Sequence, residues 1–140
     1  MKRIFWLLSV LFFSSCNNTN IPGSEAEAQT YESGKSYRVG KAESEIGLKI
    51  LEIYESRCPE GVECIWHGYA GVKFEVSIGA STFTDSLYTP GYPHMNLYKT
   101  KEFQAEGRRY NITLEDVLPY PCNNCGNPGK PKAILDVKPL

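Results

Sequence analysis

The run GVKFEVSIGASTFTDSLY, residues 71–88, decides the fold. In its first eight residues every second side chain is apolar: Val72, Phe74, Val76 and Ile78. This period of two is typical of a β-strand that buries one face and exposes the other. Gly79 and Ala80 follow, and a second strand-like run begins directly after them. A two-residue connection that contains glycine predicts an antiparallel β-hairpin.

Other segments repeat the alternation, at residues 36–40, 45–54, 108–118 and 132–138. The apolar positions change phase after Ile50 and after Leu114, as they do when a β-bulge adds one residue to a strand. Residues 88–98 contain the run TPGYPH, whose prolines and glycine exclude a regular ladder. The spacing predicts a single all-β domain of six or seven short strands, an antiparallel β-sandwich or barrel.

The N-terminal residues have the three parts of a secretory signal: a basic start, a ten-residue stretch with nine apolar side chains, and two serines. The apolar stretch is shorter than the roughly 20 residues that span a bilayer. The run FSSC resembles the lipobox of bacterial lipoproteins, which implies that residues 1–15 are removed and Cys16 is acylated. We therefore expect a lipid-anchored, extracytoplasmic protein on the cell membrane or outer membrane. The alternative is an ordinary secretory signal with an incidental cysteine.

Residues 16–33 are polar and lack apolar periodicity, which predicts a flexible tether and leaves residues 34–140 for the folded domain. Removing Lys2 and Arg3 with the signal leaves 13 basic and 16 acidic side chains, a net charge of −3. No basic stripe occurs, so nucleic-acid binding is disfavoured.

The densest feature is the run SRCPEGVECIWHG, residues 56–68. Cys58 and Cys64 bracket a five-residue turn, and in an exported protein such a pair is most simply a disulfide. Trp66 lies two residues beyond Cys64, so we expect it to pack on that disulfide as part of the core; the alternative is stacking against a ligand. Arg57 lies at the rim of the loop, where a solvated charge or a structural pair with a carboxylate is the simplest interpretation.

Cys122 and Cys125 form a C-x-x-C between a proline and the run GNPG. Redox catalysis needs a helix N-terminus to lower the thiol pKa, and this composition predicts a loop. We expect local disulfides, Cys58–Cys64 and Cys122–Cys125. The alternatives are a long-range pair such as Cys58–Cys125, or a zinc site built from the four thiolates or with His67. Neither a metal nor a cofactor is predicted.

Two islands of sequence carry a resemblance. The run SRCPEGVECIW, together with PYP at residues 119–121, resembles a family of uncharacterised bacterial lipoproteins with a Ser-Arg-Cys-Pro-x-Gly-Val-x-Cys-x-Trp core. The resemblance spans most of residues 45–138 and implies a secreted β domain without assigning an activity. His67 stands where that family leads us to expect a small residue, and the second cysteine pair is a local addition.

No nucleophile elbow and no His-Glu-x-x-His motif occurs, so no catalytic residue is predicted. We expect a non-enzymatic binding or interaction module of the cell envelope with an unknown protein or glycan ligand, because loops on a rigid β-scaffold commonly carry binding. The candidate surface residues are Arg57, His67, Tyr69 and Tyr92. The alternatives are a structural accessory subunit of an envelope complex and a hydrolase that uses His67 or His94.

One modification signal also occurs. The tripeptide Asp85-Ser86-Leu87 resembles the O-glycosylation sequon of Bacteroidota. A motif of three residues has little specificity.

The lipobox generates a direct prediction. Replacing the acceptor thiol, Cys16→Ala, should leave the protein unlipidated and accumulating as precursor, because the thioether-linked lipid requires that sulfur. Immunoblotting of membrane fractions, with a labelled fatty acid in the growth medium, measures both properties. Normal maturation and membrane retention of the variant would refute lipid anchoring at Cys16.

Overall fold

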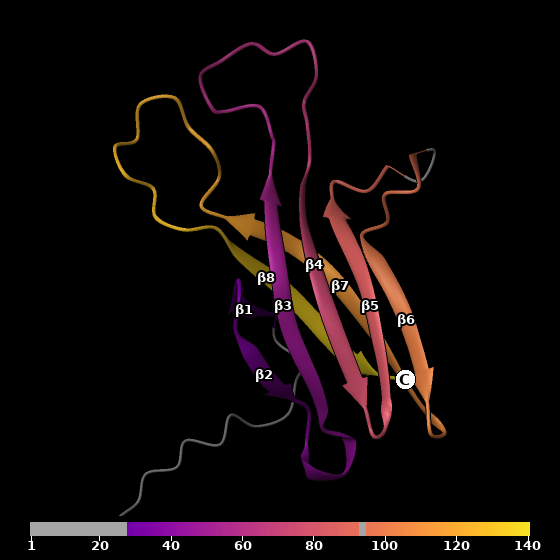
Figure 1. Ribbon diagram of the computed structural model, residues 1–140. Helices are drawn as coiled ribbons and strands as arrows, with labels where there is room; N and C mark the ends of the chain where they lie inside the picture. The colour runs from indigo at the N-terminus through magenta and orange to yellow at the C-terminus, as the bar shows by residue number, and fades with distance from the viewer. Residues whose placement is uncertain (1–27, 93–94) are drawn as a thin grey trace, which may run out of the picture.

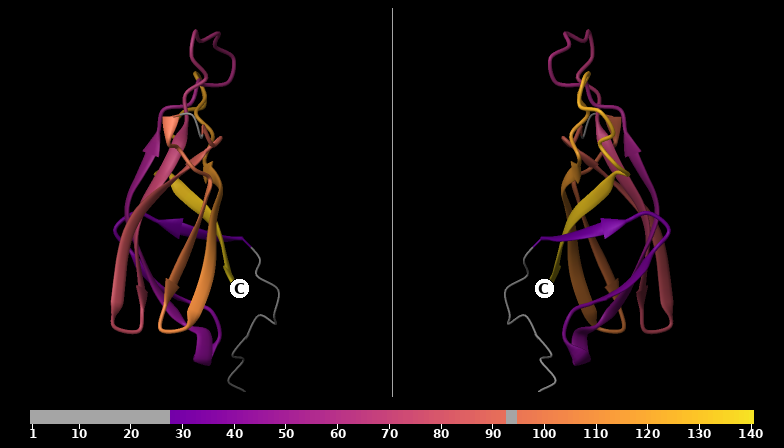
Figure 2. Two further views of the ribbon diagram at one scale, coloured as in Figure 1. Left: turned by 90° about the vertical axis from the view of Figure 1, so that its right-hand side faces the viewer. Right: turned by 90° about the vertical axis from the view of Figure 1, so that its left-hand side faces the viewer.

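The computed structural model describes residues 28–92 and 95–140. Two four-stranded antiparallel sheets pack face to face as a β-sandwich (Figures 1 and 2). One sheet has the order β1-β8-β7-β6 and the other β2-β3-β4-β5. The strands of the described part are β1 (Gln29–Glu32), β2 (Ser36–Val39), β3 (Ile46–Glu55), β4 (Ala70–Ile78), β5 (Ser81–Thr89), β6 (Thr100–Ala105), β7 (Arg108–Leu118) and β8 (Lys132–Pro139). A 3-10 turn, Ala42–Ser44, precedes β3.

The predicted hairpin is confirmed. β4 pairs with β5 from Ala70↔Thr89 to Ile78↔Ser81, across the Gly79–Ala80 turn. The alternating side chains of β4 are fully buried and form the centre of the core with residues from β3, β7 and β8. Phe74 contacts Phe103 of the other sheet, with ring centroids 5.9 Å apart, so aromatic packing joins the two layers.

Both predicted bulges are present. The β3–β4 register shifts between Ile50 and Glu52, and the β7–β8 register shifts between Leu114 and Asp116. Beyond its bulge, β3 again alternates: Ile53 packs against the core and Glu55 lies on the same face. The extra residue therefore turns a carboxylate toward the space between the sheets at the end of the strand.

Two strands were missed. The predicted tether was too long, because its last residues form β1 and pair with β8. Tyr31 of β1 is only 2% exposed and meets Tyr37 edge-on, with ring centroids 4.9 Å apart. β6 was also missed, because Phe103 is its one buried side chain and a single apolar residue makes no alternation.

In the described residues, no helix has the length and apolar character needed to cross a membrane.

Tyr31 allows a test of whether β1 belongs to the folded domain. Burial, with smaller contributions from Tyr37 and Asp136, raises the pKa of Tyr31 to about 12 from 10.0. A phenol whose pKa is raised by folding stabilises the fold below its unfolded pKa, and this contribution is lost as the pH rises from 10 toward 12. We expect a loss of about 2–3 kcal/mol of unfolding free energy in that window.

The variant Tyr31→Phe should lack most of this alkaline loss, since it has no proton to release. Urea denaturation of the mature protein at pH 9 and near pH 12, followed by circular dichroism, measures the difference. Equal alkaline loss in both proteins would contradict the placement of Tyr31 in the core.

Candidate functional site

Three long connections gather at one end of the sandwich, the upper end in Figure 1. We call this the loop end; it comprises residues 56–69 between β3 and β4, the described residues of 90–99 between β5 and β6, and residues 119–131 between β7 and β8. The β3–β4 loop projects farthest from the body in Figures 1 and 2. The other end has short turns and the Ala42–Ser44 segment.

Arg57 joins the two sheets at the base of the loop end. Its guanidinium bonds to Glu55 of β3 (Nε to Oε1, 2.9 Å) and to Asp116 of β7 (Nη1 to Oδ1, 2.7 Å). It also donates to the backbone carbonyl of Val117 and lies 4.3 Å from the ring centroid of Tyr120. Nearly every side of the guanidinium is thus in contact with protein.

The charge of Arg57 is compensated within this network. Burial disfavours the charged guanidinium, but the hydrogen bonds and charges of Glu55 and Asp116 outweigh burial, so the pKa of Arg57 is raised. Because Arg57 is only 8% exposed, it does not belong to a contact surface, and that assignment was wrong. The alternative interpretation, a structural pair with a carboxylate, is confirmed.

The β3–β4 loop is held at several levels. Its base continues the ladder, with Ser56 N donating to Tyr69 O (3.0 Å) and Cys58 N donating to His67 O (2.8 Å). The Cys58–Cys64 disulfide, with 5.9 Å between Cα atoms, closes the outer part. The loop is therefore a pinned projection of the β3–β4 pair.

The second disulfide, Cys122–Cys125, has a Cα separation of 5.8 Å, so both pairs are local as expected. Its loop meets the first, because Glu60 N donates to Pro121 O (2.9 Å) and Glu60 pairs with Cys122 in a β-bridge. The four cysteines pair as two separate disulfides, whereas the zinc alternative requires free thiolates. Two disulfides place the domain in an oxidising, extracytoplasmic compartment.

Trp66 is not part of the core, so the prediction that it packs there on the Cys58–Cys64 disulfide was wrong. Its side chain is 51% exposed and rests against Tyr92, with ring centroids 5.4 Å apart. The Tyr92 hydroxyl donates to the carbonyl of Gly68 (3.4 Å). The prediction assumed that the strand begins near Cys64, whereas β4 begins at Ala70 and Trp66 remains in the loop.

Exposed large apolar side chains concentrate at the loop end. Among the described residues they are Val62, Ile65, Trp66, Met95, Tyr98, Leu118 and Tyr120, while the opposite end contributes Leu140. Ile65 is fully exposed at the projecting loop. We call Val62, Ile65 and Trp66 the apolar tip. Apolar side chains that gather at one place on a surface mark an interaction site, whereas scattered ones need no explanation.

A second feature lies at the base of the same loop, on the outer face of the β2-β3-β4-β5 sheet. Tyr54, Tyr69 and Tyr88, with Glu55 and Ser56, line a cavity of about 280 Å³ that we call the tyrosine cleft. Tyr69 and Tyr88 meet edge-on, with centroids 5.4 Å apart and planes at 89°.

The phenol of Tyr54 stays protonated at neutral pH. Burial and a hydrogen bond to Glu52 raise the pKa of Tyr54. The cleft therefore presents a neutral hydroxyl beside its aromatic rings.

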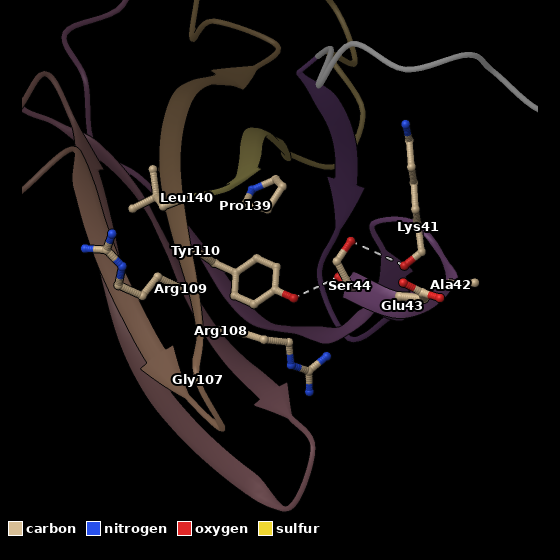
Figure 3. Close-up of a pocket in the computed structure, with 10 residues that line it drawn as sticks. All are labelled: Lys41, Ala42, Glu43, Ser44, Gly107, Arg108, Arg109, Tyr110, Pro139 and Leu140. Atoms are coloured by element: carbon tan, nitrogen blue, oxygen red, sulfur yellow. Dashed lines mark hydrogen bonds between the residues drawn. The ribbon is translucent and has the colours of Figure 1, made fainter.

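A cavity of about 650 Å³ lies at the opposite end between the Ala42–Ser44 turn and the β6–β7 turn (Figure 3). Its cations Lys41, Arg108 and Arg109 extend in different directions, so they do not converge on one ligand position. The Tyr110 hydroxyl is used to hold the turn by donating to Ser44 O (2.9 Å). This arrangement is structural.

The structure places His67, Tyr69 and Tyr92 at the loop end, each in different surroundings. Tyr69 lies in the tyrosine cleft and Tyr92 packs on Trp66. His67 is exposed on the loop, where its backbone carbonyl accepts from Cys58. His94 and Cys16 lie outside the described residues.

Ser86 of the sequon-like tripeptide lies within β5, opposite Lys73. Leu87 beside it is fully buried in the core. Asp85 pairs with Lys101 at 2.6 Å.

Sequence reasoning missed the residues that build both surface features. Val62 was assigned to the five-residue turn between Cys58 and Cys64, and Ile65 was given no role. Tyr54 and Tyr88 were assigned to strands whose pairing partners were not predicted. In the structure both residues pair with Gly71, from the two sides of β4. Only the strand registers show that these two tyrosines flank the same glycine.

Comparison of the chain with protein-family models, with curated proteins and with solved structures finds no match. The resemblance to the bacterial lipoprotein family therefore stays a prediction. The site has to be interpreted from its own chemistry.

The Arg57 network makes a stability prediction. Arg57→Ala should lower the unfolding free energy by about 3–5 kcal/mol, because it leaves Glu55 poorly solvated and without its partner. Arg57→Lys should recover part of this loss, since an ammonium replaces the charge without the planar fork. Urea denaturation of the purified mature protein measures both effects.

The matched control is Arg38→Ala. Arg38 pairs with Glu45 but its side chain is 82% exposed, so its loss should cost less than about 1 kcal/mol. Equal effects of the Arg57 and Arg38 variants would show that the buried network does not hold the loop end.

Proposed function

We propose that this chain is a lipid-anchored protein of the bacterial cell envelope whose β-sandwich is a non-enzymatic binding module. The loop end, with its apolar tip, binds a protein partner. The observation that carries this proposal is the position of Val62, Ile65 and Trp66 on a projecting loop that a disulfide and backbone hydrogen bonds hold in place.

The energetics favour binding at the tip. Burying a large apolar side chain contributes roughly 1.5–3 kcal/mol, and tryptophan is among the residues that dominate protein interfaces. A loop that is already ordered loses little conformational entropy when a partner binds it. Removing the Ile65 side chain from water in the complex then stabilises the complex.

The placement of the chain is compatible with anchoring. β1 begins with Gln29 opposite Leu135, in the middle of β8, so the described chain starts away from the loop end. Lipid attachment at Cys16 rests on the FSSC run. The anchor and the binding surface thus use separate parts of the molecule.

We place the binding role ahead of the two alternatives. A hydrolase needs the imidazole of His67 or His94 beside a carboxylate, whereas His67 is exposed on the projecting β3–β4 loop. A structural accessory subunit would also use a protein contact at the apolar tip. The identity of the partner found at the tip distinguishes the two roles. A subunit of an envelope complex would indicate the accessory role, and a separate ligand protein would indicate the binding role.

Site-specific cross-linking in the native envelope tests the proposal. Replacing Ile65 by the photo-cross-linking residue benzoylphenylalanine in the full-length protein should give a discrete product with one partner. Adding Val62→Ser and Trp66→Ser should abolish that product, because the remaining contacts bury little apolar surface.

The same photo-reactive residue at Leu140 is the matched control. Leu140 is 60% exposed but lies at the opposite end of the sandwich. Products that are the same at both positions, or the absence of any product at position 65, would contradict the proposal.

A further inference from the structure

We infer that the tyrosine cleft binds a single uncharged sugar ring. This site is separate from the apolar tip, and its ligand does not depend on the partner proposed above. The inference starts from the sheet register, in which Tyr54 of β3 and Tyr88 of β5 both pair with Gly71 of β4. The neighbouring residue Val72 is fully buried, so these three residues form a row on the outer face.

Gly71 shapes the floor of the cleft. A Cβ atom at this position would lie 2.6 Å from Cδ1 of Tyr88, so the tyrosine ring lies directly over the glycine. Glycine inside a strand commonly marks such a close approach. The ring of Tyr88 therefore lies flat on the sheet. Any other residue at position 71 would push this ring outward.

Tyr69 forms a wall against this floor. Its ring stands at 89° to the ring of Tyr88. Its backbone carbonyl accepts from both Ser56 N (3.0 Å) and Ser56 Oγ (2.7 Å), which fixes the wall to the end of β3. The rings of Tyr69 and Tyr88 are thus already in position without a ligand, which lowers the entropic cost of binding.

The size and charge of the cleft select the ligand. Its volume of about 280 Å³ is at the lower limit of small-molecule sites, which suits one ring. Glu55 is the one acidic residue in its lining, and its carboxylate turns away from the cleft to pair with Arg57. No uncompensated charge in the lining would attract an ion, so the ligand is neutral.

The combination of rings and hydroxyls points to a sugar. A pyranose has an apolar C–H face that packs on an aromatic ring and hydroxyls that exchange hydrogen bonds with phenols. A purely apolar ligand would displace water from the phenols of Tyr69 and Tyr88 without replacing its hydrogen bonds, which is unfavourable. An extended peptide pairs with a sheet edge, whereas this cleft lies over the central strand β4.

Saturation-transfer difference NMR on the detergent-solubilised mature lipoprotein tests the inference. The detergent must carry no sugar headgroup. The probes are methyl β-D-glucopyranoside, methyl α-D-mannopyranoside and N-acetylglucosamine, with methyl β-D-glucuronide as the charged comparison. At least one neutral probe should bind with a Kd on the order of 1 mM, the range expected for so few contacts.

Variants assign the signal to the cleft. Tyr69→Ala should raise the Kd roughly 3- to 10-fold, the value of one aromatic stack, and Tyr69→Phe should raise the Kd less, since it keeps the ring and loses only the hydroxyl. Tyr98→Ala is the matched control, because Tyr98 is an exposed tyrosine of the same end that does not line the cleft. Circular dichroism verifies that each variant keeps its β-sheet spectrum.

Three results would overturn the inference: no transfer to any neutral probe with the folded wild-type protein, equal loss of affinity in Tyr69→Ala and Tyr98→Ala, or tighter binding of the glucuronide than of the neutral sugars. None of these results bears on cross-linking at residue 65, so the two proposals fail separately.

Discussion

The loop end depends on one buried guanidinium. Arg57 reaches from the start of the β3–β4 loop to Asp116 and Val117 of the opposite sheet, so a single side chain closes the gap where the two layers separate. Tyr120 covers its face and thereby orders the start of the β7–β8 loop. Because the charge is compensated on both sides, the interior tolerates it where a lone cation would be expelled. The β3–β4 loop and the β7–β8 loop therefore both begin at the contacts of Arg57.

The β3 bulge connects this junction with the outer surface. By adding one residue after Ile50, it turns Glu55 inward to Arg57 and Tyr54 outward to the tyrosine cleft. An unbulged strand would exchange these two faces, since side chains alternate with a period of two. One local irregularity therefore sets the internal ion pair and a surface cavity together. Both the ion pair and the cleft are therefore consequences of the β3–β4 register.

Local patterns predicted the β4–β5 hairpin, both bulges and both disulfides, because each depends on residues close in sequence. β1 escaped because its only core residue, Tyr31, stands in a polar segment, and its pairing with β8 is a contact between the two ends of the domain. The burial of Arg57 and the exposure of Trp66 escaped for a related reason. Each is decided by how far a loop extends before its strand begins, and composition does not encode that distance.

The lengths of the sheet edges bear on aggregation. An exposed edge strand offers unpaired backbone groups to a neighbouring molecule, and a high local concentration of the protein would make such pairing frequent. Here β1 and β2, which end their sheets on one side, are four residues long each, too short to template a stable ladder. On the other side the longer edge, β5, is tied to β6 of the second sheet through Asp85 and Lys101 (2.6 Å), which places charges along both strands. Short edges on one side and charged edges on the other thus disfavour strand-to-strand polymerisation of the sandwich.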